Sequence, residues 1–270
     1  MQPNTNTHPL DQAVALRPGA DNQFTGSTSD AYQNMVGPFG GVIAATLLNG
    51  VLQHPALQGQ PVAQTVHFTA PIADGEFLLT ARPMRTNRST QHWLVELIQN
   101  DQVAAYATAI TAHRRDTWQA TDAQFPTVPA AEDVAVSEPP ALGWTANYEM
   151  RFVDGGFGGP SHPEHPSLSH VWLRDRPDRP LDFTSLSALC DAFFPRIFLR
   201  RQERAPIGTV TLTSYFHADA DGLRAVGTKP VLGVARGLNY GQGFFDQSAE
   251  VWSDSGMLLA SSHQMVYFKA

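Results

Sequence analysis

The sequence predicts an α+β protein built from two similar halves, and three observations lead to this prediction. Each half contains one apolar helical stretch that is followed by a run of long strands. Short turn sequences, such as Asp74-Gly75 and Asp221-Gly222, recur at matching places between those strands. A stretch from 116 to 146, rich in proline and acidic residues, separates the halves. A repeat this long indicates a duplicated domain rather than a solenoid.

The helices are expected at 39–53, ending before Pro55, and at 182–200, where Pro195 should kink or divide the helix. In the last strand of each half, successive side chains alternate between two faces, as in a half-buried strand. The strands are expected at 62–70, 75–87, 91–100 and 102–113 in the first half, and at 207–217, 222–233, 243–253 and 257–268 in the second.

One helix followed by antiparallel strands does not permit a βαβ unit. The alternative is a sheet that wraps around a central helix, which is the hotdog arrangement. We therefore predict a double hotdog, with one domain at 1–115, a linker at 116–146 and a second domain at 147–270. The two sheets should join into one continuous sheet.

Composition excludes several classes of function. The 270 residues are 42% hydrophobic and only 16% charged, so a large core is available. The net charge is −7. No dense basic stretch is present, which argues against nucleic acid as a partner. The segment from Met1 to Asp11 lacks the apolar core of a signal peptide, and no apolar run could cross a bilayer. We expect a cytoplasmic protein without membrane contact. Cys190 is the single cysteine, so neither a disulfide nor a cysteine-rich metal site is expected.

Asp191 lies within the apolar helical run 183–194. A carboxylate in such surroundings is costly to bury unless it has partners. It is therefore either a structural group, paired with an arginine such as Arg196 or Arg200 or bonded to nearby backbone, or a group that does chemistry.

Four segments together resemble the double-hotdog acyl-CoA thioesterases. They are the strand 209–217, the chain ending 254–264, the helix start 39–45 and the strand 66–71. The resemblance covers nearly the whole chain apart from the linker and the extreme N-terminus. Bacterial type-II members use an Asp, a Thr and a Gln around a water molecule. By position, the resemblance places these roles on Asp191, Thr209 and Gln264. Thr211 and Thr213 are expected on the same strand face as Thr209, so a two-residue shift would move the hydroxyl role.

The resemblance implies hydrolysis of an acyl-CoA thioester to a free acid and coenzyme A, with Asp191 as the base that activates water. The amides of Gly40 and Gly41 should bind the developing oxyanion, because a helix start carries unpaired N–H groups and glycine lets a ligand approach closely. Coenzyme A is then part of the substrate, and neither a metal nor another cofactor is expected. Hotdog domains usually associate, so a homodimer or larger homo-oligomer is expected.

The first helix carries no carboxylate between Phe39 and Gln53, so the second, pseudo-equivalent site should be inactive. Three alternatives stay open. Asp191 could attack the carbonyl directly and form a mixed anhydride. The protein could bind an acyl thioester without cleaving it. It could also be a hotdog enoyl-thioester hydratase or dehydratase, but those enzymes use a histidine near the helix start, and neither helix has one before its last turn.

Several arginines are candidates for contact with the phosphates of coenzyme A. They are Arg88, Arg114, Arg115, Arg200, Arg201 and Arg204.

Overall fold

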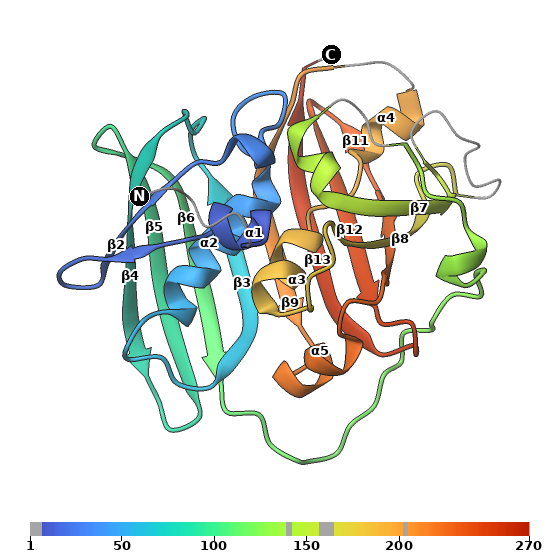
Figure 1. Ribbon diagram of the computed structural model, residues 1–270. Helices are drawn as coiled ribbons and strands as arrows, with labels where there is room; N and C mark the ends of the chain where they lie inside the picture. The colour runs from blue at the N-terminus through green and yellow to red at the C-terminus, as the bar shows by residue number, and fades with distance from the viewer. Residues whose placement is uncertain (1–6, 139–141, 157–164, 202–204, 270) are drawn as a thin grey trace.

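The two halves of the chain lie side by side and share one sheet (Figure 1). The computed structural model describes residues 7–138, 142–156, 165–201 and 205–269. Within these residues the strands form a 13-stranded sheet in the order β1-β2-β4-β5-β6-β3-β9-β13-β12-β10-β8-β7, and β11 pairs with β12 at its side. Every strand pair is antiparallel, so the predicted α+β double hotdog is confirmed.

The N-terminal half wraps four long strands around one helix, as predicted. It opens with α1 (Pro9–Ala13), β1 (Arg17–Pro18), β2 (Gln23–Ser27) and the 3₁₀ helix η1 (Asp30–Tyr32). The central helix is α2 (Gly40–Leu52). The long strands are β3 (Gln60–Phe68), β4 (Glu76–Thr86), β5 (Thr90–Gln99) and β6 (Gln102–Ala112).

Helix α2 is apolar on nearly all sides, because the sheet surrounds it, and this is the pattern of a buried helix. Gly50 lets the helix approach the sheet closely. A Cβ atom at this position would lie 2.5 Å from the side chain of Leu79 on β4.

The C-terminal half repeats this plan with a divided helix. Its elements are η2 (Ala131–Asp133), η3 (Gly143–Asn147), β7 (Tyr148–Asp154), β8 (Ser169–Asp175), α3 (Phe183–Leu189), α4 (Arg196–Arg201), β9 (Ile207–Phe216), α5 (Ala220–Val226), β10 (Val231–Arg236), β11 (Tyr240–Gly241), β12 (Phe244–Trp252) and β13 (Leu258–Phe268). The predicted division of the second helix is confirmed, and Pro195 immediately precedes α4.

The predicted strand at 222–233 is wrong. Helix α5 occupies its first part, and β10 begins only at Val231. The Asp221-Gly222 pair suggested a hairpin turn, but it lies in the first turn of α5. The side chain of Asp219 caps this helix by accepting a hydrogen bond from the N–H of Gly222 at 2.8 Å.

Strands β3 and β9 join the two halves at the centre of the sheet. Gln64 on β3 ties the two central helices together from this position. Its Nε2 donates to the carbonyl of Ala44 on α2, and its Oε1 accepts from the hydroxyl of Ser187 on α3, both at 3.0 Å. Since Gln64 is buried, these bonds replace its contacts with water.

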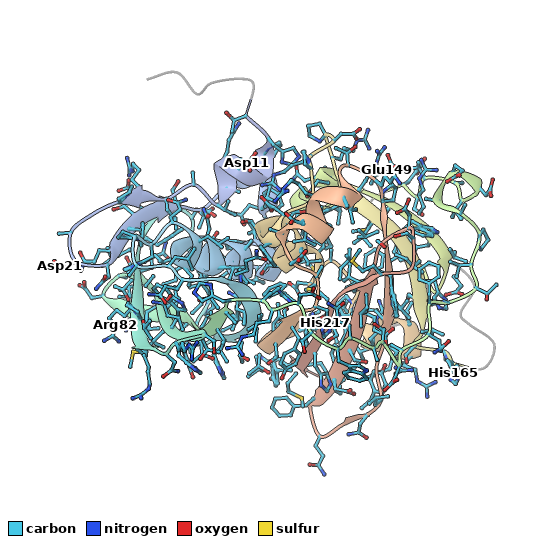
Figure 2. The ribbon with its side chains drawn as sticks, turned by 90° about the horizontal axis from the view of Figure 1, so that it is seen from below. Asp11, Asp21, Arg82, Glu149, His165 and His217 are labelled. Atoms are coloured by element: carbon cyan, nitrogen blue, oxygen red, sulfur yellow. The ribbon has the colours of Figure 1, made fainter. Side chains whose placement is uncertain are left out.

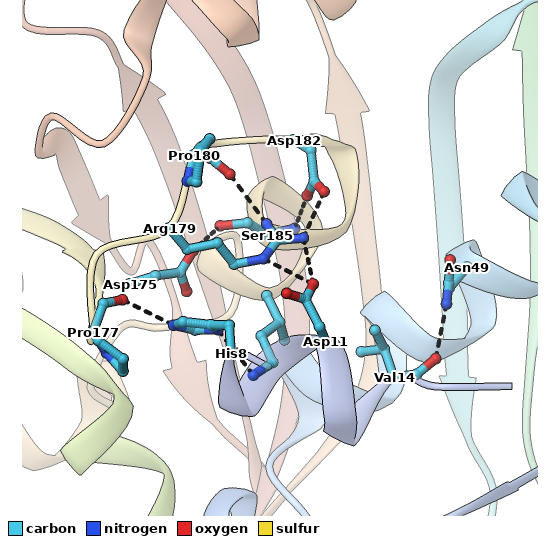
Figure 3. A network of polar contacts seen from close by, with 11 residues as sticks. His8, Asp11, Val14, Asn49, Asp175, Pro177, Arg179, Pro180, Asp182 and Ser185 are labelled. Carbon is cyan, nitrogen blue, oxygen red and sulfur yellow. Dashed lines mark hydrogen bonds and ion pairs between the residues drawn. The ribbon is translucent and has the colours of Figure 1, made fainter. Parts of the chain in front are cut away.

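The segments outside the two cores are also held in place. The linker runs from one half to the other along the lower side of the molecule (Figure 1) and then covers the outer face of the C-terminal sheet, where Trp172 donates to the carbonyl of Pro129 at 2.9 Å. The N-terminal segment packs beside α3, because Arg179 bonds both Asp11 and Asp182 (Figure 3). In the described part of the chain, no helix is long and apolar enough to cross a membrane.

Replacing Gln64 by alanine should lower the free energy of unfolding by about 2–3 kcal/mol, because Ser187 and Ala44 would lose buried hydrogen-bond partners. Chemical denaturation measures this change. Gln102→Ala, at an exposed position on β6, is the control and should alter stability by less than about 0.5 kcal/mol. Equal effects of the two substitutions would show that Gln64 does not hold the central helices together.

Candidate active site

A cavity of about 320 Å³ lies between the halves and takes its walls from both of them. The N-terminal half contributes Phe39 and Gly40 at the start of α2. The C-terminal half contributes Asp191, Thr209 and Gln264. The three side chains that the resemblance selected come from separate segments, and the fold brings them to one cavity.

Asp191 lies in the turn that follows α3, where its backbone N–H bonds the carbonyl of Ala188. Its Oδ1 accepts a hydrogen bond from Nε2 of Gln264 at 2.8 Å. The backbone N–H of Gly41 also donates to this carboxylate. A Cβ atom on residue 40 would lie 2.7 Å from Oδ2 of Asp191, so the carboxylate can approach the helix start only because Gly40 has no side chain.

Burial raises the pKa of Asp191 to about 7, although the hydrogen bonds from Gln264 and Gly41 act in the opposite direction. Among the described residues no arginine, lysine or histidine forms an ion pair with it. Arg196 instead donates to the carbonyl of Phe194 and the hydroxyl of Ser169. The expected ion pair with Arg196 or Arg200 is therefore wrong, whereas the other structural alternative, a bond to backbone, agrees with the hydrogen bond from Gly41.

A β-bulge decides which threonine faces the cavity. Strand β9 pairs Thr211 with Met265 but Thr209 with Val266, so Val210 is the extra residue. The expectation that Thr211 and Thr213 share a face with Thr209 is wrong, because the bulge reverses the alternation. Thr209 lines the cavity and its hydroxyl donates to Oε1 of Gln264 at 3.4 Å.

Five aromatic side chains of the described residues line the cavity, and they are Phe39, Trp144, Phe193, Phe194 and Phe198. Trp144 lies within the predicted linker segment, yet it is buried and stacks on Phe39 with ring centroids 4.2 Å apart. Phe194 stacks on Phe152. Gln247 also lines the cavity, because β12 places it directly opposite Gln264. The alternation of residues along β12 could have indicated that Gln247 lines the cavity, whereas no sequence pattern indicated this for Trp144.

The pseudo-equivalent position beside α2 has a different character. Asn49 near the end of α2 donates to the carbonyl of Val14 at 2.8 Å, and the N-terminal segment packs against it (Figure 3). The inactivity of this second position stays a prediction.

Family models decide the relationship of the chain to known proteins. A model of the acyl-CoA thioesterase C-terminal domain matches residues 114–268, and a model of the N-terminal domain matches residues 29–112. The chain belongs to the acyl-CoA thioesterase family. No curated protein matches it.

Solved structures share this fold. A conserved hotdog protein of unknown function from Alicyclobacillus acidocaldarius is 44% identical, with a TM-score of 0.93 over 98% of this chain and 99% of that one. A putative thioesterase II from Thermobifida fusca has a TM-score of 0.82 at 17% identity, over 98% and 99% of the two chains. The acyl-CoA thioesterase II TesB2 from Mycobacterium marinum has a TM-score of 0.79 at 18% identity, over 96% and 98%. The last two similarities establish the fold alone.

The raised pKa of Asp191 predicts an unusual dependence of stability on pH. The unfolded chain releases this proton near pH ~4, whereas the folded protein retains it to about pH 7. The folded state therefore binds more protons between these values, and the free energy of unfolding falls as the pH rises. In Asp191→Asn this contribution is absent, so its stability relative to wild type should increase by ~2–4 kcal/mol between pH 4 and 8.

Denaturant titrations across this pH range measure the difference. Asp101→Asn, on an exposed turn between β5 and β6, is the control and should follow the wild-type curve. If Asp191→Asn also parallels wild type at every pH, the carboxyl group has an ordinary pKa in the folded protein.

Proposed function

We propose that this member of the acyl-CoA thioesterase family hydrolyses acyl-CoA to a free acid and coenzyme A, with Asp191 as the general base. One observation carries the proposal. The carboxyl group of Asp191 borders a cavity shared by both halves, beside the start of α2, and has no counter-ion among the described residues. A carboxylate with a pKa of about 7 is well matched to proton transfer near neutral pH.

In the proposed reaction Asp191 removes a proton from a water molecule as the water oxygen bonds to the thioester carbonyl carbon. Gln264 holds the carboxylate through Nε2, and its own amide is oriented by the hydroxyl of Thr209. Thr209 can accept a hydrogen bond from the same water. The tetrahedral intermediate then breaks its carbon–sulfur bond, and the leaving thiolate takes up the proton. General base assistance of this kind contributes ~10²–10⁴-fold.

The oxyanion site is assigned to the start of α2. The N–H groups of Val42 and Ile43 already bond the carbonyl of Phe39, which leaves those of Gly40 and Gly41 outside the helical ladder. Gly41 faces the Asp191 carboxylate, so the Gly40 amide is the better placed donor for the thioester oxygen. An oxyanion donor contributes roughly 3–4 kcal/mol to the transition state.

Several finer points stay proposals. Coenzyme A enters as part of the substrate, and the reaction as written requires no other cofactor. Direct attack by Asp191 would use the same geometry and is the alternative mechanism. No described residue lining the cavity is a histidine, which disfavours the hydratase alternative. We also propose that the chain assembles into a homodimer or larger homo-oligomer and that it is cytoplasmic, as its sequence leads us to expect.

Asp191→Asn should lower kcat/KM for acyl-CoA at least ~10²-fold, because an amide cannot take a proton from water. The assay follows released thiol across a panel of acyl-CoA substrates of different length and branching. The thiol reagent will spare the folded enzyme, since Cys190 is fully buried. Asp101→Asn, which keeps the cavity intact, is the matched control. Unchanged turnover in Asp191→Asn would remove this residue from the mechanism.

The pH profile gives a separate test of the base. In the wild type, kcat/KM should rise with pH and level off above about pH 7, because Asp191 must lose its proton to act. Gln264→Leu removes a hydrogen bond that favours the carboxylate, so the rise should move to higher pH. Gln247→Leu is the control, because Gln247 lines the same cavity but accepts from the N–H of Arg196 instead. A midpoint that moves equally in both variants would contradict this role of Gln264.

A further inference from the structure

A second pocket with a basic lining lies on the outer side of α4. Its volume is about 370 Å³, and we call it the arginine pocket. Its lining includes His165, Arg200, Arg236, Leu238 and Tyr240. Figure 1 shows α4 beside β11 at the top of the C-terminal half, and Figure 2 shows His165 at the end of the molecule opposite Asp21 and Arg82. None of these residues belongs to the cavity that contains Asp191.

The charges of this pocket are suited to an anion. Neither Arg200 nor Arg236 forms an ion pair with a described acidic residue. The guanidinium of Arg200 lies over the ring of Tyr240, 6.0 Å from its centroid, which orients the charge at the pocket wall. The nearby carboxylate of Asp246 already has partners, because it accepts from the N–H groups of Leu238 and Asn239 and lies 3.1 Å from Nε2 of His263.

The pocket is separated from the catalytic cavity by a single short helix. Phe198 of α4 lines the cavity, whereas Arg200 of the same helix lines the arginine pocket. Tyr240 stacks on Phe245, which packs in one apolar cluster with Val266, itself a wall residue of the cavity. A helix with its side chains is about 10–12 Å across. An extended arm such as pantetheine is long enough to pass over it.

We propose that the arginine pocket binds the phosphates at the nucleotide end of coenzyme A while the thioester lies beside Asp191. This inference rests on the proposed function, since it assigns the remote end of the same substrate. Two arginines that face one concavity are suited to phosphate oxygens. Leu238 is 71% exposed beside them and offers an apolar surface for the adenine ring.

A nucleotide is a better occupant than an acyl carrier protein. The pocket is concave and of the size that small-molecule sites have. The protein carries a net charge of −7, which opposes close approach of a large acidic partner but has little effect on a small anion inside a basic pocket.

Adenosine 3′,5′-bisphosphate, the nucleotide end of coenzyme A without its arm, is the direct probe. Isothermal titration calorimetry should detect its binding to wild type, and the double variant Arg200→Gln, Arg236→Gln should bind it ~10-fold more weakly. The size of the effect is modest because both arginines are exposed. Arg224→Gln, an exposed arginine on α5, is the control and should bind as wild type does. Equal binding by wild type and the double variant would overturn the assignment.

Kinetics supply the second arm. We compare an acyl-CoA with the same acyl group on N-acetylcysteamine, which lacks the nucleotide. The quantity compared is kcat/KM for the CoA thioester divided by kcat/KM for the N-acetylcysteamine thioester. This ratio should be ~10-fold lower in the double variant than in wild type, mainly because KM for the CoA thioester rises. An unchanged ratio, or an arginine-dependent preference for an acyl carrier protein thioester, would overturn the inference while leaving the hydrolase intact. Arginine-dependent nucleotide binding without hydrolysis of any thioester would instead overturn the proposed function and support the pocket.

Discussion

The contact between the Asp191 carboxylate and the start of α2 is the constraint on which the site depends. The carboxylate comes from the C-terminal half, and the amide of Gly41 that faces it comes from the N-terminal half. A Cβ atom at position 40 would lie only 2.7 Å from Oδ2, so this carboxylate position requires a glycine. The cavity therefore exists only when the halves are packed together, and the joint between β3 and β9 and the buried Gln64 hold them in this arrangement.

The duplicated fold explains why one carboxylate is found where two related positions exist. Each half supplies a central helix within its part of the sheet, so the architecture creates two similar junctions. At one junction Asp191 faces the glycine start of α2, and aromatic side chains such as Phe39 and Trp144 leave a cavity. At the other, Asn49 is tied to the N-terminal segment, and Arg179 holds that segment in place. The two halves thus share one architecture but differ in the side chains at their junctions.

The division of the second helix has consequences on both of its sides. Pro195 ends the turn after α3 and allows α4 to start in a new direction. Phe198 of α4 then lines the cavity that contains Asp191, while the end of the helix presents Arg200 to the surface beside β11. In one straight helix over 182–200, the side chains of Phe198 and Arg200 would have followed the axis of α3. The break thus places an apolar cavity wall and the arginine pocket on two sides of one short helix.

The sequence by itself determined the helix and strand pattern, the duplication and the unusual place of Asp191, because periodicity and turn residues are local properties. It failed at 222–233, where the Asp219 cap outweighed the hairpin signal of Asp221-Gly222. Only the tertiary structure decided that Thr209 and not Thr211 faces the cavity, since a bulge depends on pairing with β13. It also decided that Asp191 has no arginine partner in the part of the chain that the structure describes, that Trp144 forms a cavity wall, and that Arg200 and Arg236 line one pocket. These outcomes depend on contacts between segments far apart in the chain, which no local pattern encodes.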